Sequence, residues 1–379
     1  MRVCYLLPGL GHTGGSMVLY NFMDKLSERG YTVHAVTPEG ALRWGPGFSR
    51  EVIRRFKSGA PRGITPWVKR GVKNILKRSG LRVDAPLRLY RLIQHTQVLV
   101  RNWVESDITI ATFWTTAYPT FFLSERTLPL YHLQHWEEVF CHDEFSRQMV
   151  RLTYRLPLGL ISNSSWLRET VRKRVGRESY LLLPGVDSKT FSPRGDIRSK
   201  YSNPKTVRIV TYFSPVDFKG WPDGVAAMRK VFAEAGAARV EWLVYGGRPR
   251  THPGVPVSFV GCLFGQELAD LYSSAHIVFM PSWYESFPLP PIEAMACGAA
   301  VVVTGTGTED YAVDEENALV RPARDPVRLA AAILELIRSP SKAYRLAKAG
   351  LETARKMTWE AATDRLEEIL QTSVRLPTV

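Results

Sequence analysis

The chain has 379 residues, 45% of them hydrophobic and 23% charged, with 50 Lys and Arg against 36 Asp and Glu and a formal net charge of +14. This composition excludes a largely disordered chain, and the length suits two domains of roughly 100–200 residues each. The four cysteines form no C-x-x-C pair, which excludes a disulfide scaffold and a cysteine zinc module and favours a cytoplasmic compartment.

The positive charge is concentrated in the first half of the chain. Residues 1–200 contain 31 Lys and Arg and 16 Asp and Glu, whereas residues 201–379 contain 19 and 20. Within the basic half, residues 64–78 predict a basic amphipathic helix that carries Trp67. Such a helix either lies on an anionic membrane surface or packs its apolar stripe on its own domain. No nucleic-acid-binding motif accompanies the charge, so we expect no nucleic-acid partner.

In chain order, apolar runs alternate with helical patterns. The first half has apolar runs that predict strands at 2–8, 31–37, 108–113, 128–133 and 159–162. A glycine loop follows the first of these and leads into a helix expected at 17–29. The second half repeats the pattern, with strands at 207–212, 240–246, 257–260, 277–280 and 300–304 and helices at 223–235, 266–274, 291–297 and 326–339. The alternation predicts an α/β fold: two doubly wound, Rossmann-like domains of parallel strands with a cleft between them.

A polar stretch rich in Pro, Ser and Gly separates the two halves. We expect it, residues 191–205, to be the linker between a basic N-terminal domain at 1–190 and a second domain at 206–356. The remaining segment, 357–379, contains an amphipathic pattern that predicts a last helix at 359–371.

The glycine loop leaves several interpretations open. Gly9, Gly11 and Gly14 match the dinucleotide fingerprint between a strand and a helix. The acidic residue that this fingerprint requires would be Glu39, which lies beyond Pro38 and past the expected strand end. A glycine loop at a helix start lets backbone N–H groups approach any phosphate or sugar, and it can also be a simple tight turn.

The most specific pattern lies in residues 257–322. Glu285 and Glu293 stand eight positions apart there, inside the run from Tyr284 to Gly298. This region resembles the donor-binding region of family-four retaining glycosyltransferases, which have the GT-B fold. The resemblance extends over most of the chain through four further motifs: Gly14-Gly15, Ile161–Trp166, Pro184–Asp187 with Phe191, and Lys219-Gly220.

This resemblance implies an enzyme that moves a hexose or deoxyhexose from a nucleotide-diphosphate sugar to a glycan or lipid-linked acceptor, as in cell-envelope polysaccharide synthesis. It also implies that the terminal helix crosses back to the first domain. The implied donor-binding residues are Gly14, Gly15, Lys219, Arg248, Ser286, Phe287, Pro288, Leu289 and Glu293, and the implied catalytic residues are Glu285, His135 and Lys219.

The chemistry of these residues suits the implied roles. Pro290 and Pro291 are typical of a helix start, whose positive end favours a diphosphate. Glu293 would accept hydrogen bonds from ribose hydroxyls and Glu285 from the donor sugar, while Lys219 would supply a point charge for the leaving diphosphate. The alternative is that Glu285 and Glu293 are only helix-start carboxylates, favoured by the helix dipole, and that Lys219 is an ordinary surface residue.

The family's chemistry is substitution at the anomeric carbon with retained configuration, usually viewed as front-face attack. The protein then acts mainly by positioning and charge stabilisation. No D-x-D triplet occurs in the sequence, so we expect no metal and no cofactor beyond the nucleotide-sugar substrate.

A second candidate cluster follows the strand expected at 128–133. It contains His132, His135, Trp136 and Glu137, where parallel sheets place ligands. The resemblance implies that this loop faces the donor sugar. We favour His135 over His132 for the contact with that sugar, and Glu137 is a candidate for contact with the acceptor. Two ordinary loop histidines are the alternative. A zinc site lacks a clear third ligand.

Two departures from the family pattern limit the resemblance. No Arg precedes Lys219 within Thr211–Lys219, so diphosphate charge would come from elsewhere, such as Arg248. Pro288 stands where the family often has Gly, and proline offers no backbone N–H. We therefore expect a donor whose hydroxyl pattern differs from glucose at that point, as in a deoxy sugar.

Two other functions stay open. One is a sugar- or nucleotide-binding GT-B protein without transfer activity, and the other is an NAD-linked oxidoreductase that rests on the glycine loop alone. We expect a cytoplasmic protein. Peripheral association of the basic first domain with the inner face of the membrane is an open alternative.

Overall fold

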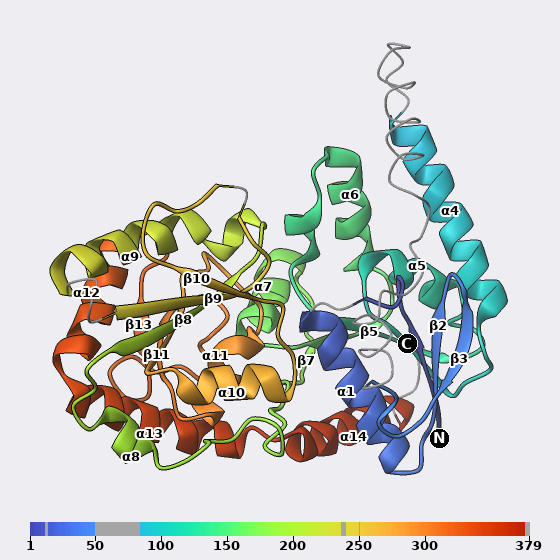
Figure 1. Ribbon diagram of the computed structural model, residues 1–379. Helices are drawn as coiled ribbons and strands as arrows, with labels where there is room; N and C mark the ends of the chain where they lie inside the picture. The colour runs from blue at the N-terminus through green and yellow to red at the C-terminus, as the bar shows by residue number, and fades with distance from the viewer. Residues whose placement is uncertain (12–13, 50–83, 236–239, 250, 376–379) are drawn as a thin grey trace. The chain divides into compact units, whose positions relative to one another are not determined.

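The computed structural model describes residues 1–11, 14–49, 84–235, 240–249 and 251–375 (Figure 1). The basic helix expected at 64–78 lies outside these residues. The chain forms two compact units. Unit 1 comprises Met1–Ser162, Thr170–Tyr180 and Thr363–Val379, and unit 2 comprises Asn163–Glu169 and Leu181–Ala362.

Unit 1 is built on a seven-stranded sheet of order β3-β2-β1-β4-β5-β6-β7. Its strands are β1 (Arg2–Leu6), β2 (Thr32–Thr37), β3 (Gly40–Trp44), β4 (Ile108–Ala111), β5 (Leu128–Leu133), β6 (Gly159–Ser162) and β7 (Tyr180–Leu181). Its helical elements are α1 (Gly14–Glu28), α4 (Asp84–Asn102), α5 (Trp114–Phe122), η1 (Glu137–Phe140), α6 (Glu144–Thr153) and most of α7 (Ser165–Val175). Strands β1 and β4 are fully buried apart from Arg2, as apolar runs predict for a covered parallel sheet.

One strand of unit 1 departs from the expected all-parallel arrangement. β3 pairs with β2 antiparallel, from Val33 opposite Trp44 to Thr37 opposite Gly40. The turn between them contains Glu39, which is exposed and whose N–H donates to Thr37 Oγ1 at 3.2 Å. The carboxylate that a dinucleotide site would require therefore lies in a surface hairpin turn.

The last helix, α14 (Trp359–Arg375), contributes its residues from Thr363 onward to unit 1. Arg29, just after α1, forms ion pairs with Asp364 (2.7 Å) and Glu367. Leu366 and Leu370 are fully buried, because the helix turns one apolar stripe inward.

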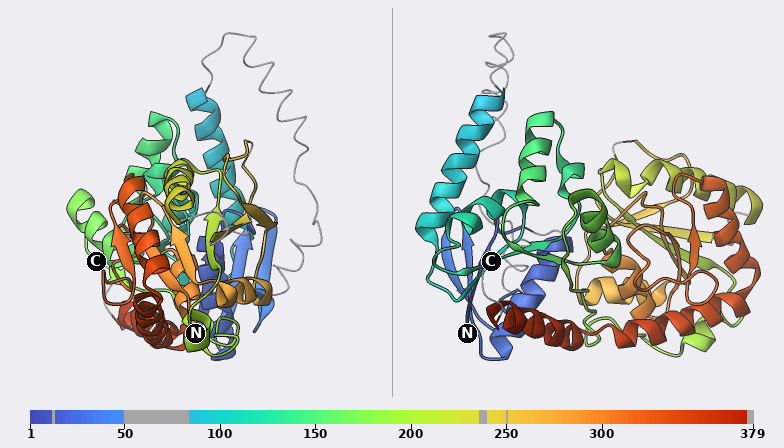
Figure 2. Two further views of the ribbon diagram at one scale, coloured as in Figure 1. Left: turned by 60° about the vertical axis from the view of Figure 1, so that its left-hand side comes forward. Right: turned by 180° about the vertical axis from the view of Figure 1, so that it is seen from behind.

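Unit 2 is an all-parallel, six-stranded sheet of order β10-β9-β8-β11-β12-β13, and Figure 2 shows this unit from two further sides. Its strands are β8 (Val207–Phe213), β9 (Val240–Gly246), β10 (Ser258–Gly261), β11 (Ile277–Met280), β12 (Ala300–Thr304) and β13 (Leu319–Arg321). Its helical elements are α8 (Ile197–Tyr201), η2 (Asp217–Lys219), α9 (Trp221–Ala235), α10 (Gln266–Ser274), α11 (Leu289–Ala296), α12 (Pro326–Arg338) and α13 (Pro340–Lys356).

Two apolar clusters cover the two faces of this sheet. One joins the sheet to α9 and α12, and the other joins it to α10 and α11. Covering both faces explains why β11 and β12 are buried along their whole length. Parallel strands also bring the loops after β8, β11 and β12 to one edge of the sheet.

Residues 191–205 are part of unit 2 rather than a free linker. α8 lies within them, and Lys200 Nζ donates to the carbonyl oxygens of Ser273 (3.2 Å), Ala275 (2.9 Å) and Gly298 (2.7 Å). Ser273 lies in the last turn of α10, and Ala275 and Gly298 follow the ends of α10 and α11, where helices leave acceptors unpaired. The polar composition of the segment therefore reflects a cap on two helices, which sequence reasoning interpreted as a linker.

Candidate functional site

The loop after β8 carries Lys219 and is held against the loop after β11. Gly220 has a φ of +67°, and a Cβ at this position would lie 1.9 Å from the carbonyl oxygen of Pro281. The N–H of Trp283 donates to the carbonyl of Phe218 at 2.7 Å, and its indole donates to Asp223 at 2.6 Å. Only glycine permits this approach of the two backbones, and the approach brings Lys219 beside the second loop.

Lys219 and Glu285 form an ion pair at the centre of this arrangement. Lys219 Nζ lies 2.7 Å from Oε1 and 2.9 Å from Oε2 of Glu285. Their side chains are 23% and 9% exposed, so the pair is largely withdrawn from water. Ser282 Oγ donates to Oε1 of the same carboxylate at 2.8 Å. Two residues predicted as catalytic are thus brought together from positions 66 residues apart in the chain.

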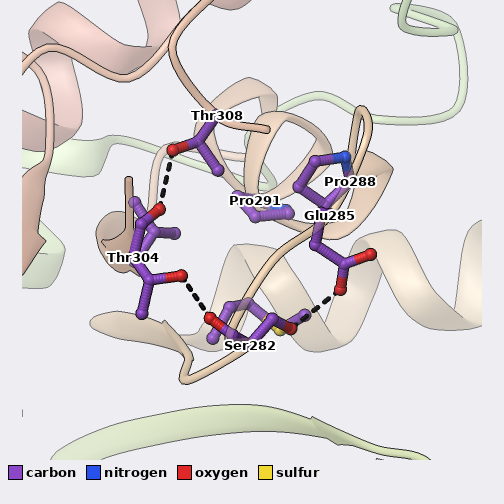
Figure 3. Close-up of a pocket in the computed structure, with 8 residues that line it drawn as sticks. Ser282, Glu285, Pro288, Pro291, Thr304 and Thr308 are labelled. Atoms are coloured by element: carbon purple, nitrogen blue, oxygen red, sulfur yellow. Dashed lines mark hydrogen bonds between the residues drawn. The ribbon is translucent and has the colours of Figure 1, made fainter. Parts of the chain in front are cut away.

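A small pocket lies beside this carboxylate (Figure 3). Half of its lining side chains carry oxygen and half are apolar: Ser282, Glu285, Thr304 and Thr308, and Met280, Pro288, Pro291 and Val303. The hydroxyls are fixed in place, because Thr304 Oγ1 donates to the Ser282 carbonyl and Thr308 Oγ1 donates to the Thr304 carbonyl at 2.8 Å. Sequence reasoning missed these hydroxyl residues, although their positions at the ends of β11 and β12 could have indicated them.

The start of α11 lies at the same pocket, through Pro288 and Pro291. The helix starts at Leu289 after Pro288, which provides no side-chain cap, and prolines 290 and 291 occupy its first turn. Two of the helix's first four residues therefore lack an N–H. The helix dipole is retained, but this helix start has fewer donors for an anion than an ordinary one.

The residues after Glu285 are held by neighbours within unit 2. Ser286 Oγ bonds the side chain of Asn163 and lies 3.2 Å from Ser164 Oγ. The Phe287 ring packs edge-on against Tyr311, whose hydroxyl donates to the Pro288 carbonyl at 2.9 Å. Ser286 and Phe287 are both buried, so their role in this structure is to fix the loop that carries Glu285.

Glu293 lies within α11 and is only partly exposed. Burial, together with the negative charge of Asp187, raises the pKa of its carboxyl to about 8. At neutral pH the side chain is therefore mostly a neutral acid, with one O–H donor besides its acceptor oxygen. This differs from the ionised acceptor that sequence reasoning assumed.

Arg248 does not join the ion pair at Lys219 and Glu285. Its side chain is exposed, and its guanidinium carbon lies 5.5 Å from the ring centre of Phe259. The predicted contact of Arg248 with the donor diphosphate stays a prediction.

In unit 1, the glycine loop is closed by its own helix. Tyr20 OH accepts from the Gly11 N–H and donates to the Gly11 carbonyl, both at 3.0 Å. A Cβ at Gly15 would touch the Gln134 side chain at 3.5 Å, whereas Gly14 has open space around it. The two glycines predicted for donor binding thus differ: Gly15 packs against the loop that precedes His135, and Gly14 does not.

The two candidate histidines, His132 and His135, are both buried, at 1% and 8% exposure. Burial lowers the pKa of His132 to about 3, so it stays neutral. His135 Nδ1 lies 3.3 Å from the carbonyl of Trp136, and its ring meets Phe140 edge-on.

Glu137 is 1% exposed, so it does not present its carboxylate to solvent as an acceptor contact would require. Its Oε2 instead accepts the N–H of Trp114 at 2.6 Å. In this structure the carboxyl accepts a hydrogen bond from the first turn of helix α5.

Among the described residues, no three His, Cys, Asp or Glu side chains come together as metal ligands would. His132 and His135 therefore gain no third ligand there. No helix in the described ranges is long and apolar enough to cross a membrane.

Comparison with known proteins identifies part of the chain directly. Residues 207–339 match the family described as Glycosyl transferases group 1. A D-inositol 3-phosphate glycosyltransferase from Thermomonospora curvata is 29% identical over 216 residues, which are 50% of each chain. The O-antigen biosynthesis protein RfbC of Myxococcus xanthus is 28% identical over 267 residues, 69% of this chain and 20% of that protein. The chain thus matches half or less of the length of these relatives.

Solved structures show the same fold over nearly the whole chain. Sucrose-phosphate synthase from Thermosynechococcus elongatus has a TM-score of 0.69 at 20% identity and covers 98% of both chains. HepE from Anabaena, solved with UDP-glucose, has a TM-score of 0.71 at 16% identity and covers 98% of this chain and 100% of its own. The expected GT-B fold is confirmed. Lys219, Glu285 and Glu293 all lie within residues 207–339, the part of the chain that matches the group 1 glycosyltransferase family.

Proposed function

We propose that the protein is a retaining glycosyltransferase that takes a sugar from a nucleotide-diphosphate donor without a metal ion. The Lys219–Glu285 pair beside the pocket at the start of α11 carries this proposal. It sets a cation, a carboxylate and fixed hydroxyls at the edge of a parallel sheet, where such folds bind ligands. Structural relatives solved with UDP-glucose and UDP support a nucleotide-sugar donor.

In the proposed reaction, the acceptor hydroxyl attacks the anomeric carbon from the side that the diphosphate leaves. The new carbon–oxygen bond forms as the bond to the phosphate oxygen breaks, and that oxygen takes the acceptor proton. Lys219 stabilises the charge that develops on the leaving diphosphate, and Glu285 accepts hydrogen bonds from the sugar. His135 contacts the donor sugar, and Glu293 and Arg248 contact the nucleotide portion.

Glu285 is suited to hold substrate rather than to act as a nucleophile. Both of its oxygens already contact Lys219, and Oε1 also accepts from Ser282. A carboxylate that accepts three hydrogen bonds from two donor groups is a weaker nucleophile and a well-fixed acceptor. This arrangement supports front-face substitution over a covalent glycosyl-enzyme intermediate.

For the acceptor, we propose a glycan or a lipid-linked glycan. One relative is named as an O-antigen biosynthesis protein and several as D-inositol 3-phosphate glycosyltransferases. A phosphorylated polyol is therefore the natural competitor in the same assay. The excess of positive charge in residues 1–200 suits an anionic acceptor or an anionic membrane surface.

The test is a transfer assay with UDP-, GDP-, ADP-, dTDP- and CDP-sugars, including deoxy sugars, against inositol phosphate and lipid-linked glycans. The product's anomeric configuration is read by NMR, and each reaction is repeated with EDTA. We expect retention, no EDTA effect, and a loss of about 10²-fold or more in Lys219→Ala. The matched control is Lys230→Ala, an exposed lysine on α9. Inversion, EDTA sensitivity or an unaffected Lys219→Ala would each contradict the proposal.

The same pair supports a second candidate, a protein that binds nucleotide sugars without transferring them. Both oxygens of Glu285 engage the only lysine predicted for the diphosphate, and Thr211–Lys219 contains no arginine. Nucleotide-sugar binding with no transfer to any acceptor, and no slow hydrolysis of the donor, would favour this candidate.

A further inference from the structure

Helix α5 of unit 1 begins without a cap of its own. Its N-cap residue is Phe113, whose side chain has no oxygen to accept the N–H groups of the first turn. Thr116 Oγ1 accepts from the N–H groups of Thr112 (2.9 Å) and Phe113 (3.0 Å), which precede the helix. The N–H of Trp114, the first helical residue, needs an acceptor from elsewhere in the fold.

Glu137 supplies this acceptor from 23 residues away. Its Oε2 accepts the Trp114 N–H at 2.6 Å. β4 and β5 are parallel neighbours in the sheet, so the segments that follow them, one leading into α5 and one containing Glu137, leave the same edge. The contact therefore bridges two adjacent segments at the ligand-binding edge of unit 1.

The backbone around Glu137 is held from a second side. The N–H of Glu137 donates to Tyr154 OH at 2.8 Å, and the Tyr154 ring lies 4.6 Å from that of Trp136. His135 immediately precedes this pair, and its Nδ1 lies 3.3 Å from the Trp136 carbonyl. Residues 136 and 137 are thus fixed by α5 and by the end of α6, and they fix the position of His135.

We propose that Glu137 is a positioning residue, whose carboxyl locks the loop that carries His135 onto the first turn of α5. The inference rests on the proposed function, in which His135 contacts the donor sugar. Glu137 itself touches neither donor nor acceptor. A displacement of about 1 Å in a contacting group costs as much as 10²-fold in rate, so a loose loop would lower turnover while donor binding in unit 2 stays intact.

The groups that face the carboxyl agree with a buried, neutral acid at pH 7. Tyr131 from β5, Tyr154 after α6 and Cys141 from the following loop lie close to it, besides the Trp114 N–H. Burial raises the pKa of Glu137 to about 8. A glutamine has the same shape and keeps an acceptor oxygen, so it reproduces the lock, whereas leucine removes it.

The test compares Glu137→Leu with Glu137→Gln in the full chain. We expect Glu137→Leu to lower kcat by at least ~10-fold per folded molecule while the donor KM changes by less than ~2-fold. Glu137→Gln should restore kcat. Glu138→Gln is the matched control, since Glu138 lies on the same short helix and its carboxylate pairs with the half-exposed Arg151 instead of with α5. Equal kcat in Glu137→Leu and wild type would overturn the proposal, as would equal losses in Leu and Gln.

A second pair of variants tests the hydrogen bond between Trp114 and Glu137 by changing its donor residue. Trp114→Pro removes the N–H at a helix position that tolerates proline, and extended Phe113 suits a following proline. Trp114→Ala removes the ring but keeps the N–H. We expect only Trp114→Pro to reproduce the kcat loss of Glu137→Leu, and equal kcat in the two Trp114 variants would refute the lock.

Hydrogen exchange separates this inference from the proposed function, because it needs no activity. The Trp114 amide should exchange faster in Glu137→Leu than in Glu137→Gln, together with the amides of residues 135–140. If wild type transfers no sugar but the two variants differ in exchange as expected, the proposed function fails, while the hydrogen bond between Glu137 and the Trp114 N–H is confirmed. If wild type is active and exchange is equal in both variants, the lock fails alone.

Discussion

Glu293 should make the stability of unit 2 fall as pH rises through neutrality. Its pKa is about 8 in the folded chain against an ordinary 4.5, because burial and Asp187 disfavour the ionised form. A carboxyl whose pKa is raised on folding stabilises the fold fully below about pH 4.5, and this contribution is lost as pH rises through the folded value.

The magnitude follows from the titration window. Between about pH 6 and pH 8, the unfolded carboxyl is ionised and the folded one is largely protonated. Each pH unit in this window lowers the free energy of unfolding by about 1.36 kcal/mol, so two units lower it by at most ~2.7 kcal/mol. Because Glu293 keeps partial contact with solvent, we expect a loss of roughly 1–2 kcal/mol.

The assay compares wild type with Glu293→Gln and Asp187→Asn. Hydrogen exchange of the buried β12 amides reports the opening of unit 2 alone, and comparing variants at one pH cancels the intrinsic exchange rate. Between pH 6 and pH 8, the free energy of unfolding of Glu293→Gln should fall by about 1–2 kcal/mol less than that of wild type. The fall for Asp187→Asn should lie between the two. The same pH dependence in wild type and Glu293→Gln would refute the reasoning.

Two further predictions concern the frame of unit 2. Gly220→Ala should destabilise it by more than about 2 kcal/mol in thermal or urea unfolding, because the Cβ would clash with Pro281. Gly254→Ala is the matched control, since its φ is also positive at +73° but only a distant side-chain atom lies near. Lys200→Met should cost about 2–3 kcal/mol, because the carbonyls of Ser273 and Ala275 lose this donor and Gly298 keeps only Tyr201 OH, whereas Lys205→Met at the surface should cost little. A Lys200→Met variant as stable as wild type would show that water replaces the ammonium.

The strands were the most predictable part of the fold. β5, β11 and β12 have the bounds that the apolar runs indicated, because strands covered on both faces read as continuous apolar sequence. β3 was missed, since it has only five residues, Gly40–Trp44, and its sequence shows no apolar–polar alternation. α8 was missed because its anchoring residue, Lys200, reads as a polar linker residue until its three acceptors are known.

The residues of the site could be predicted from the sequence, but the contacts between them could not. The spacing of Glu285 and Glu293 and the resemblance around them indicated the donor region. The Lys219–Glu285 ion pair depends on the docking of Gly220 against Pro281, which no local pattern reports.

The role of Glu137 was equally hidden, because its partner is a backbone N–H of a helix that sequence reasoning did not predict. Its position two residues after His135 indicated the correct loop, but only the structure shows that the carboxyl accepts the Trp114 N–H.

The central claim is that the site with Lys219 and Glu285 binds a nucleotide-diphosphate sugar. The most direct measurement is a thermal-shift panel of UDP, GDP, dTDP, ADP and CDP, their sugar conjugates and NAD, on wild type, Lys219→Ala and Lys230→Ala. A ligand at about 100 times its Kd stabilises by about 2.7 kcal/mol. We predict a shift with one nucleotide diphosphate, a larger shift with its sugar conjugate, and a loss of both in Lys219→Ala only. A shift with NAD alone, or shifts that Lys219→Ala leaves unchanged, would contradict the claim.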